Sequence, residues 1–310
     1  MNLDISYEEL QAMFVSPSYK KIVSPYRIKR IQKGRHRFYF TAIEEKINFY
    51  ISLTSAVSKM LPNPHLSKWR GELGNVLADE VSKTAAHYGT LYHIIIAEFL
   101  KKGELDFDKL NDEVCDYLVQ VGLPMALSSE WFERIHKDML SFFQFVIEKN
   151  VEPVAIEFPI VSDRYGIGTL IDLVCTMDFN GKRVNAEVDF KSGKKGFFEA
   201  HEMQLIIGRD MWNDLYSDEF PITHIFNFAP NDWRKTPSYK LKNQSKSILN
   251  QSYKGLVDRC VIESWNTPTK TVAKGKGVFK LGQKSLESNV EIRTFTDFIK
   301  EKENANKKRK

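Results

Sequence analysis

The sequence predicts an α/β protein in which helices flank a mixed central β-sheet, behind a helical N-terminal half. Three observations predict this class. Apolar residues recur at helical spacing between residues 54 and 149, whereas short runs rich in β-branched residues dominate residues 153–191. A further helix and a further strand follow, up to residue 229. A β-hairpin followed by a helix and a strand is typical of a sheet that carries helices on its faces.

The front half begins with short strands and continues with helices, two of which we expect to be separated near Gly89, with Thr90 as a possible N-cap. The expected elements of this half are strands at 36–40 and 48–53, and helices at 54–60, 70–86, 90–102, 107–121 and 129–149. Those of the second half are strands at 153–161, 167–179, 183–191 and 222–229, a helix that carries Gln204 and ends at about 216, and a helix at 247–264.

No Gly/Ser/Pro-rich linker divides the 310 residues, so we expect one large domain with extensions. We place this domain at 51–265, between a basic N-terminal extension at 1–50 and a basic C-terminal segment at 266–310. The chain is 42% hydrophobic, but no apolar run reaches the ~18 residues of a membrane span. The start, MNLDISYEEL, does not resemble a signal peptide. We therefore expect a cytoplasmic protein without membrane contact, of a bacterium or of a phage-infected host; an organellar location stays open.

The segment GTLIDLVCTMDFNGKRVNAEVDFK, residues 168–191, carries the strongest local signal. Asn180-Gly181 between two apolar runs predicts a two-residue type I′ hairpin. This turn pairs Phe179 with Lys182 and sets Asp172 opposite Asp189. Like charges in opposed positions destabilise a hairpin, so an inward-facing pair needs a cation. A divalent metal ion would supply it.

The alternation of the second strand supports this site, since Glu187, Asp189 and Lys191 share one face. Carboxylate oxygens suit Mg²⁺ or Mn²⁺, which bind phosphate oxygens and activate water. Lys191 could orient or deprotonate that water, or hold a phosphate. The alternative is a simple salt bridge between Lys191 and Asp172 or Asp189.

Asp172 and Asp189-Phe190-Lys191 resemble the D…(D/E)-x-K core of the PD-(D/E)XK nucleases. The RecB-like branch of that superfamily also has Gly-x-x-x-His on an upstream helix, matched by Gly89-Thr90-Leu91-Tyr92-His93, and a glutamine on the following helix, matched by Gln204. With SLTSAVSKMLPNPHLSKW near residue 52, residues 50–235 are similar to phage exonucleases and to the mitochondrial genome maintenance exonuclease. The chain departs from this pattern at two positions. The family usually has glycine three residues before the first aspartate, whereas this chain has Thr169 there and Gly168 one residue earlier. Many relatives have tyrosine four residues after the glutamine, where this chain has Gly208.

The resemblance implies a restriction-endonuclease-like core and a metal bound by His93, Asp172, Asp189 and the Phe190 carbonyl. It implies that Lys191 acts on water and that Gln204 supports the site, so the implied catalytic residues are Asp172, Asp189, Lys191 and Gln204. A histidine ligand favours Mn²⁺ more than oxygen ligands alone do. Each residue also has a structural alternative, because a lone histidine on an apolar face is often a core residue and a glutamine in an apolar stripe often packs between helices.

Glu157, on the strand before the hairpin, is a possible site carboxylate or a structural partner of a nearby basic residue. The three cysteines, Cys115, Cys175 and Cys260, are too few and too scattered for a disulfide framework or a four-cysteine cluster. We therefore expect no iron–sulfur cluster. No Walker motif is present, so helicase activity would have to come from a partner protein.

Basic and aromatic residues together indicate contacts with nucleic acid, although solvated loops have the same composition. Residues 17–37 hold eight Lys or Arg and no acid, and similar blocks begin at Trp233 and Lys270. The candidate DNA-binding residues are Tyr26, Arg27, Lys29, Arg30, Lys194, Lys195, Arg234 and Lys235.

The sequence therefore predicts a metal-dependent deoxyribonuclease that hydrolyses phosphodiester bonds. The resemblance favours an exonuclease at linear or single-stranded DNA ends in recombination, repair or phage DNA metabolism, with a possible recombination or helicase partner. Two alternatives stay open: a catalytically inactive nucleic-acid-binding protein of the same fold, and a structure- or site-specific endonuclease.

Overall fold

A computed structural model describes residues 22, 28–33, 36–43, 46–61, 63–193 and 196–246. The predicted helix at 247–264 and the basic segment at 266–310 lie outside the described residues. The chain forms two compact units. The described residues of the larger unit fall within Met1–Ile22, Asn63–Phe158 and Ile171–Ser247, and those of the smaller unit fall within Val23–Pro62 and Pro159–Leu170.

The smaller unit is built around an antiparallel meander. Its elements are β1 (Ile28–Lys33), β2 (His36–Ile43), β3 (Lys46–Ser52) and α2 (Leu53–Met60). Ser52 caps α2 by accepting a hydrogen bond from the Ser55 N–H. The sequence predicted β2, β3 and α2, whereas β1 was missed inside the basic block.

The larger unit contains most of the helices and the predicted hairpin. Its described helices are α3 (Pro64–Leu73), α4 (Asn75–Lys102), α5 (Phe107–Val121), the 3₁₀ turn η1 (Met125–Leu127), α6 (Ser128–Glu148) and α7 (Glu199–Tyr216). Its strands are β6 (Lys182–Phe190), β7 (His224–Pro230) and β8 (Tyr239–Asn243), together with parts of β4 (Glu152–Ser162) and β5 (Ile167–Phe179), which run through both units.

The strand pairing confirms a mixed sheet. β5 and β6 are antiparallel, β6 and β7 are parallel, and β7 and β8 are antiparallel. In the smaller unit, β3 pairs in parallel with the start of β5. The hydrogen-bonded order is β1-β2-β3-β5-β6-β7-β8, and β4 pairs with β5. The α/β class with a helix-flanked mixed sheet is therefore confirmed.

The hairpin turn has the backbone that the sequence predicted. Asn180 and Gly181 have φ angles of 49° and 73°, as a type I′ turn requires. Phe179 pairs with Lys182, and the register continues to the pair Leu173 and Val188. The predicted register is thus confirmed over this stretch.

Helix α4 differs from the prediction because it continues through Gly89 without a break. Thr90 is not an N-cap; its hydroxyl donates to the carbonyl of Ala86, one turn earlier. The apolar face of α4 packs along its second half, and this tertiary packing outweighs the weak helix propensity of one glycine. The helix ends at Gly103, whose φ of 76° is left-handed.

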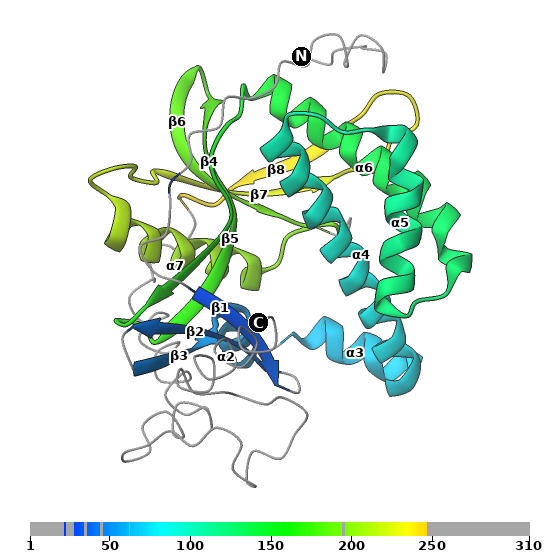
Figure 1. Ribbon diagram of the computed structural model, residues 1–310, viewed down its shortest axis with the longest axis horizontal. Coiled ribbons are helices and arrows are strands. Elements are labelled where there is room, and N and C mark those ends of the chain that lie inside the picture. The colour runs from blue at the N-terminus through cyan, green and yellow to red at the C-terminus, as the bar shows by residue number, and fades with distance from the viewer. Residues whose placement is uncertain are drawn as a thin grey trace, which may run out of the picture. The chain divides into compact units, whose positions relative to one another are not determined.

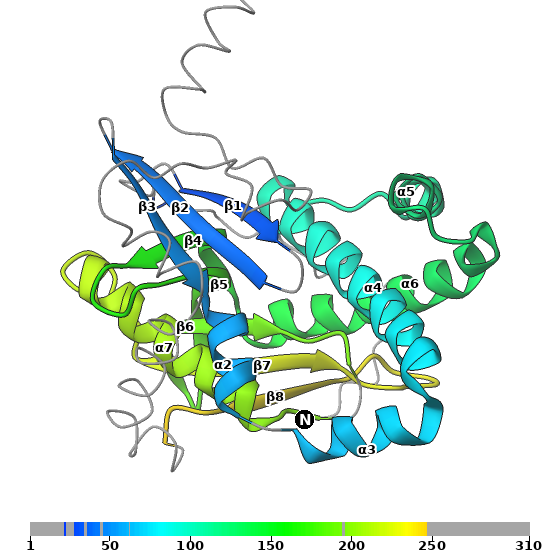
Figure 2. The same cartoon turned by 90° about the horizontal axis from the view of Figure 1, so that it is seen from below.

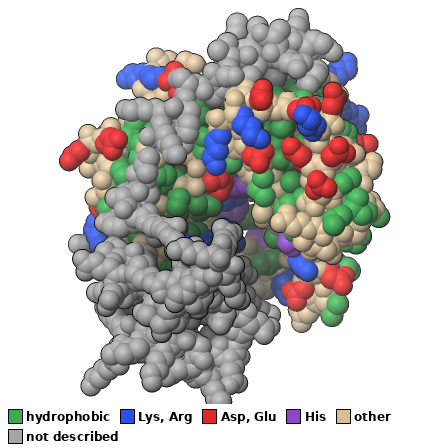
Figure 3. All heavy atoms as spheres, viewed as in Figure 1, with side chains coloured by type: hydrophobic (Ala, Val, Ile, Leu, Met, Phe, Trp, Pro, Cys, Tyr) green, Lys and Arg blue, Asp and Glu red, His purple; other side chains and the backbone are tan. Residues whose placement is uncertain are grey.

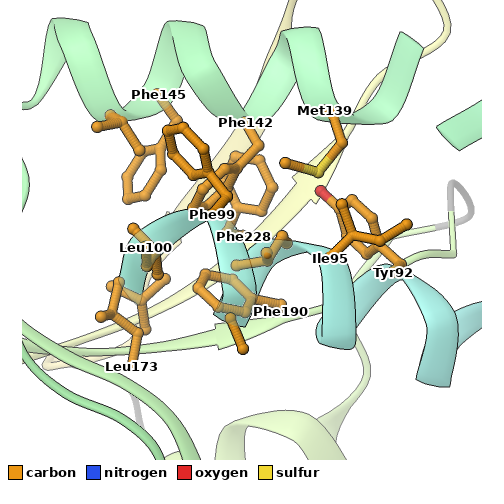
Figure 4. Packing of buried hydrophobic residues seen from close by; sticks show 14 of the residues in the cluster. Tyr92, Ile95, Phe99, Leu100, Met139, Phe142, Phe145, Leu173, Phe190 and Phe228 are labelled. Carbon is orange, nitrogen blue, oxygen red and sulfur yellow. The ribbon is translucent and has the colours of Figure 1, made fainter. Parts of the chain in front are cut away.

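The main core of the larger unit lies between α4, α6 and one face of the strands (Figure 4). Phe99 of α4 meets Phe142 of α6 edge to face, with 6.1 Å between the ring centroids. Phe142 also contacts the strands, with 5.5 Å between its ring centroid and that of Phe190. Helix α7 packs against β6 and β7, with Gly208 next to the Glu187 side chain. Figures 1 and 2 show α4 and α6 on one side of these strands and α7 on the other.

Among the described residues, no helix combines the length and the apolar character that crossing a membrane would require.

Candidate metal centre

The β5–β6 hairpin separates at the end where the two predicted aspartates lie. Regular pairing stops at Leu173 and Val188, one residue short of Asp172 and Asp189. The Asp172 carboxylate instead accepts a hydrogen bond from the Phe190 N–H at 2.8 Å. Asp172 and Asp189 therefore lie just beyond the last regular pair and do not form the directly opposed pair that the sequence predicted.

His93 brings α4 to this end of the hairpin. Its Nδ1 lies 3.2 Å from Glu157 Oε1 and 3.6 Å from Asp172 Oδ1. Its Nε2 lies 3.1 Å from the carbonyl oxygen of Phe190. His93, Glu157 and Asp172 each offer one ligand atom, and these three atoms lie within 4.8 Å of one another, a geometry that could hold a metal ion. All three side chains are partly exposed, at 26%, 23% and 12%.

Glu157 reaches this cluster through an unusual backbone conformation. Its φ angle of 46° is left-handed, which is uncommon for a residue other than glycine. The flanking residues pack differently: Ile156 joins the core beneath α4 and α6, whereas Phe158 packs on Trp212 and Tyr216 of α7. In a regular strand these two neighbours would share a face. The left-handed residue therefore shifts the alternation and directs Glu157 toward His93, as irregular strand residues beside functional sites often do.

The electrostatics of the cluster fit a cation. Burial lowers the pKa of His93, but the Asp172 and Glu157 carboxylates outweigh it and raise this pKa to about 9. Burial raises the pKa of Asp172 despite the neighbouring His93, and Asp189 and Glu157 add to the shift. Without a metal, the imidazolium of His93 therefore balances part of the carboxylate charge, and metal binding would take over that role.

Asp189 holds Lys191 beside this cluster. Lys191 Nζ lies 2.6 Å from Asp189 Oδ1, and Asn227 Nδ2 donates to Asp189 Oδ2 at 2.7 Å. Burial lowers the pKa of Lys191, but Asp189 and Asp172 reverse the effect and raise it. The salt bridge that the sequence left as an alternative is therefore present, and Asp189 lies outside the compact group of His93, Glu157 and Asp172.

Gln204 lies on α7, partly buried, and its side chain makes no hydrogen bond within the described residues. Its predicted supporting role stays a prediction. On the same helix, Gly208 leaves room for a buried neighbour, because a Cβ there would lie 2.6 Å from Glu187 Oε1. Burial raises the pKa of Glu187 well above its usual value, and this carboxyl lies on the face of β6 that carries Asp189.

Sequence reasoning missed three polar residues near the site: Asn227, Gln244 and Arg134. Arg134 donates to the carbonyl of Ser192 at 2.8 Å and stacks 3.7 Å above the ring of Tyr88. Arg134 of α6 thereby links Ser192, the residue after Lys191, to Tyr88 of α4. Asn227 had one visible signal, as a lone amide within the apolar run HIFNFAP. The sequence held no comparable signal for Gln244 or Arg134.

The candidate DNA-binding residues are only partly described. Lys29 and Arg30 are exposed on β1, and Arg234 and Lys235 are exposed between β7 and β8. On the face shown in Figure 3, acidic and basic side chains of the described residues are interspersed. Four of the candidates, Tyr26, Arg27, Lys194 and Lys195, lie outside the described residues.

Comparison with known proteins adds no relative to this picture: no family model matches the chain, and no curated protein matches it.

Proposed function

We propose that this chain is a metal-dependent DNA nuclease, and that the group formed by His93, Glu157 and Asp172 is its metal centre. The observation that carries the proposal is the meeting of this group with the Asp189–Lys191 pair at the open end of one hairpin. Under this proposal the fold is a PD-(D/E)XK core of the RecB-like branch, with the nuclease domain at 51–265.

The donor set supports Mg²⁺ or Mn²⁺. The Glu157 and Asp172 carboxylates offer hard oxygen ligands, and His93 Nδ1 beside them offers nitrogen, which favours Mn²⁺. The Phe190 carbonyl faces the other ring nitrogen of His93. When bound, the metal would polarise a phosphate oxygen and lower the pKa of a bound water. The partial exposure of the three side chains leaves the group accessible to a phosphate.

Lys191 is the chain's own contribution beside the metal. Its raised pKa keeps it protonated near neutral pH, so it acts as a hydrogen-bond donor rather than as a base. The ammonium group can hold the attacking water in place or stabilise negative charge that develops on the phosphate. Asp189 fixes its position through the 2.6 Å ion pair.

We further propose that the enzyme is an exonuclease acting on free DNA ends. The test is digestion of end-labelled linear DNA and covalently closed circular DNA with Mg²⁺ or Mn²⁺, using the wild-type protein and Lys191→Ala. A matched control is Lys182→Ala, since Lys182 is an exposed lysine at the other end of the same strand. We expect stepwise loss of linear DNA only, abolished by Lys191→Ala and kept by Lys182→Ala.

Three other results would each revise the proposal. Cleavage of circles would replace the exonuclease with an endonuclease and keep the site. Equal cleavage by Lys191→Ala would remove Lys191 from the chemistry. DNA binding without cleavage in either metal would favour a catalytically inactive binding protein.

A further inference from the structure

A buried line of side-chain hydrogen bonds runs from the end of β8 to the candidate centre. Gln244 Nε2 donates to Asn227 Oδ1 at 3.0 Å, and Asn227 Nδ2 donates to Asp189 Oδ2 at 2.7 Å. Asp189 Oδ1 in turn accepts from Lys191 at 2.6 Å. Gln244 and Asn227 are 1% and 0% exposed. Buried amides of this kind are retained when each polar end has a partner.

The bonds fix which way the Asn227 amide points. An amide has one donor end and one acceptor end, and Gln244 occupies the acceptor end. The donor end must then face Asp189, whose ionised carboxylate only accepts. Gln244 is itself held by the backbone, because its N–H donates to the carbonyl of Ile225 at 2.9 Å. The orientation of Asn227 therefore depends on the pairing of β7 with the end of β8.

This arrangement gives the two oxygens of Asp189 different partners. With Oδ2 held by Asn227, the carboxylate cannot turn freely, and Oδ1 stays directed at Lys191. A carboxylate oxygen can accept more than one bond, so the contact still leaves Asp189 able to approach a metal.

We propose that Asn227 is a positioning residue that acts on Lys191 through Asp189, and that Gln244 sets its orientation. The proposal rests on the proposed function in one respect: the position of Lys191 matters because Lys191 is expected to act on the phosphate or on water. Partners of this kind, one step behind the reacting groups, typically change activity about 10–100-fold when removed.

The test compares two variants of similar size, Asn227→Leu and Gln244→Met, with a matched control. The control is Asn213→Leu, because Asn213 also uses both ends of its amide, but only on the backbone of Ile222. We expect Asn227→Leu to lower kcat for DNA cleavage by about 10–100-fold with little change in KM. Gln244→Met should lower kcat less, because Asn227 keeps its donor. Asn213→Leu should lower the unfolding temperature and leave kcat unchanged.

A second readout does not require activity. Lys191 is 21% exposed and ion-paired, whereas Lys182 is exposed. Under limiting acetylating reagent, peptide mass spectrometry should show slow labelling of Lys191 relative to Lys182 in the wild-type protein. The ratio should rise in Asn227→Leu and stay the same in Asn213→Leu.

The two proposals fail separately. If the wild-type protein cleaves no DNA, the proposed function fails, and the labelling ratio still decides the role of Asn227. If Asn227→Leu keeps both the wild-type kcat and the wild-type labelling ratio, the positioning role is overturned. The positioning role is also overturned if the decrease in kcat is proportional to the decrease in unfolding temperature across all three variants, the control Asn213→Leu included. Should Asn227→Leu fail to fold, an unchanged labelling ratio and kcat in Gln244→Met would overturn it equally.

Discussion

Single residues at the candidate centre are held in charge states that burial alone would oppose. His93 keeps a proton because Asp172 and Glu157 lie against its Nδ1, and the Phe190 carbonyl lies against its Nε2. Both ring nitrogens face oxygen atoms, which suits the imidazolium form. A metal ligand must be a neutral imidazole, so metal binding at His93 would release a proton.

This charge state predicts a pH dependence of the metal-free protein. The folded-state pKa of His93, about 9, lies above its ordinary value of 6.5. Its contribution to stability is therefore complete below pH 6.5 and is lost as the pH rises through about 9. The pKa of Asp172 is also raised, so its contribution to stability likewise falls as the pH rises, and that fall begins at lower pH. With chelator present, we expect the unfolding temperature of the wild-type protein to fall across this window.

His93→Gln should flatten that fall, because glutamine does not titrate, and His65→Gln at an exposed position should keep it. The measurement is thermal unfolding of the three proteins between pH 6 and pH 9.5. A slope in His93→Gln equal to that of the wild-type protein would contradict the assignment.

The position of a single side chain could be predicted only where the local backbone conformation has a recognisable sequence pattern. The Asn180-Gly181 turn has a strong signal and fixed the register that brings Asp172 near Phe190. The left-handed φ of Glu157 has none, because Glu is not a residue that favours it. For that reason the sequence could place Glu157 on its strand but could not show that it turns toward His93.

At the scale of elements, the sequence missed β1 and β8 for a common reason. Both are edge strands of the hydrogen-bonded order, and both carry lysines, as IKRIQK and YKLKN. Charged residues on edge strands discourage pairing with other chains. The same charges made these segments resemble phosphate-binding loops.

Helix α7 provides a prediction at this scale. Gly208 faces the buried Glu187 carboxyl, and an added Cβ would lie 2.6 Å from Glu187 Oε1. The crowding should outweigh the helix propensity that alanine adds, so we expect Gly208→Ala to destabilise the protein by about 1–3 kcal/mol. Gly71, within α3, has nothing within 4 Å of an added Cβ. Gly71→Ala should therefore stabilise by about 0.5–1 kcal/mol.

Urea unfolding of both glycine variants beside the wild-type protein measures the two effects. Stabilisation by Gly208→Ala would show that Glu187 is not packed against α7 as described.

At the scale of the whole molecule, the larger unit alone contains the candidate centre. His93 comes from α4, Glu157 from β4, Asp172 from β5 and Lys191 from the end of β6. The order of helical and strand patterns along the chain predicted the α/β class, because that order determines which layers can form. It did not predict the division into two units, since β4 and β5 run through both and no linker marks the boundary.

The most direct test of the account is the metal dependence of DNA cleavage at this centre. End-labelled linear DNA would be incubated with increasing Mn²⁺, using the wild-type protein, Asp172→Asn and the control Asp178→Asn. Asp178 lies on the same strand but pairs with Arg183, away from the cluster. We predict Mn²⁺-dependent cleavage by the wild-type protein and by Asp178→Asn, and a rate lower by about 100-fold or more for Asp172→Asn. Wild-type cleavage in the presence of chelator, or an undiminished rate for Asp172→Asn, would contradict the account.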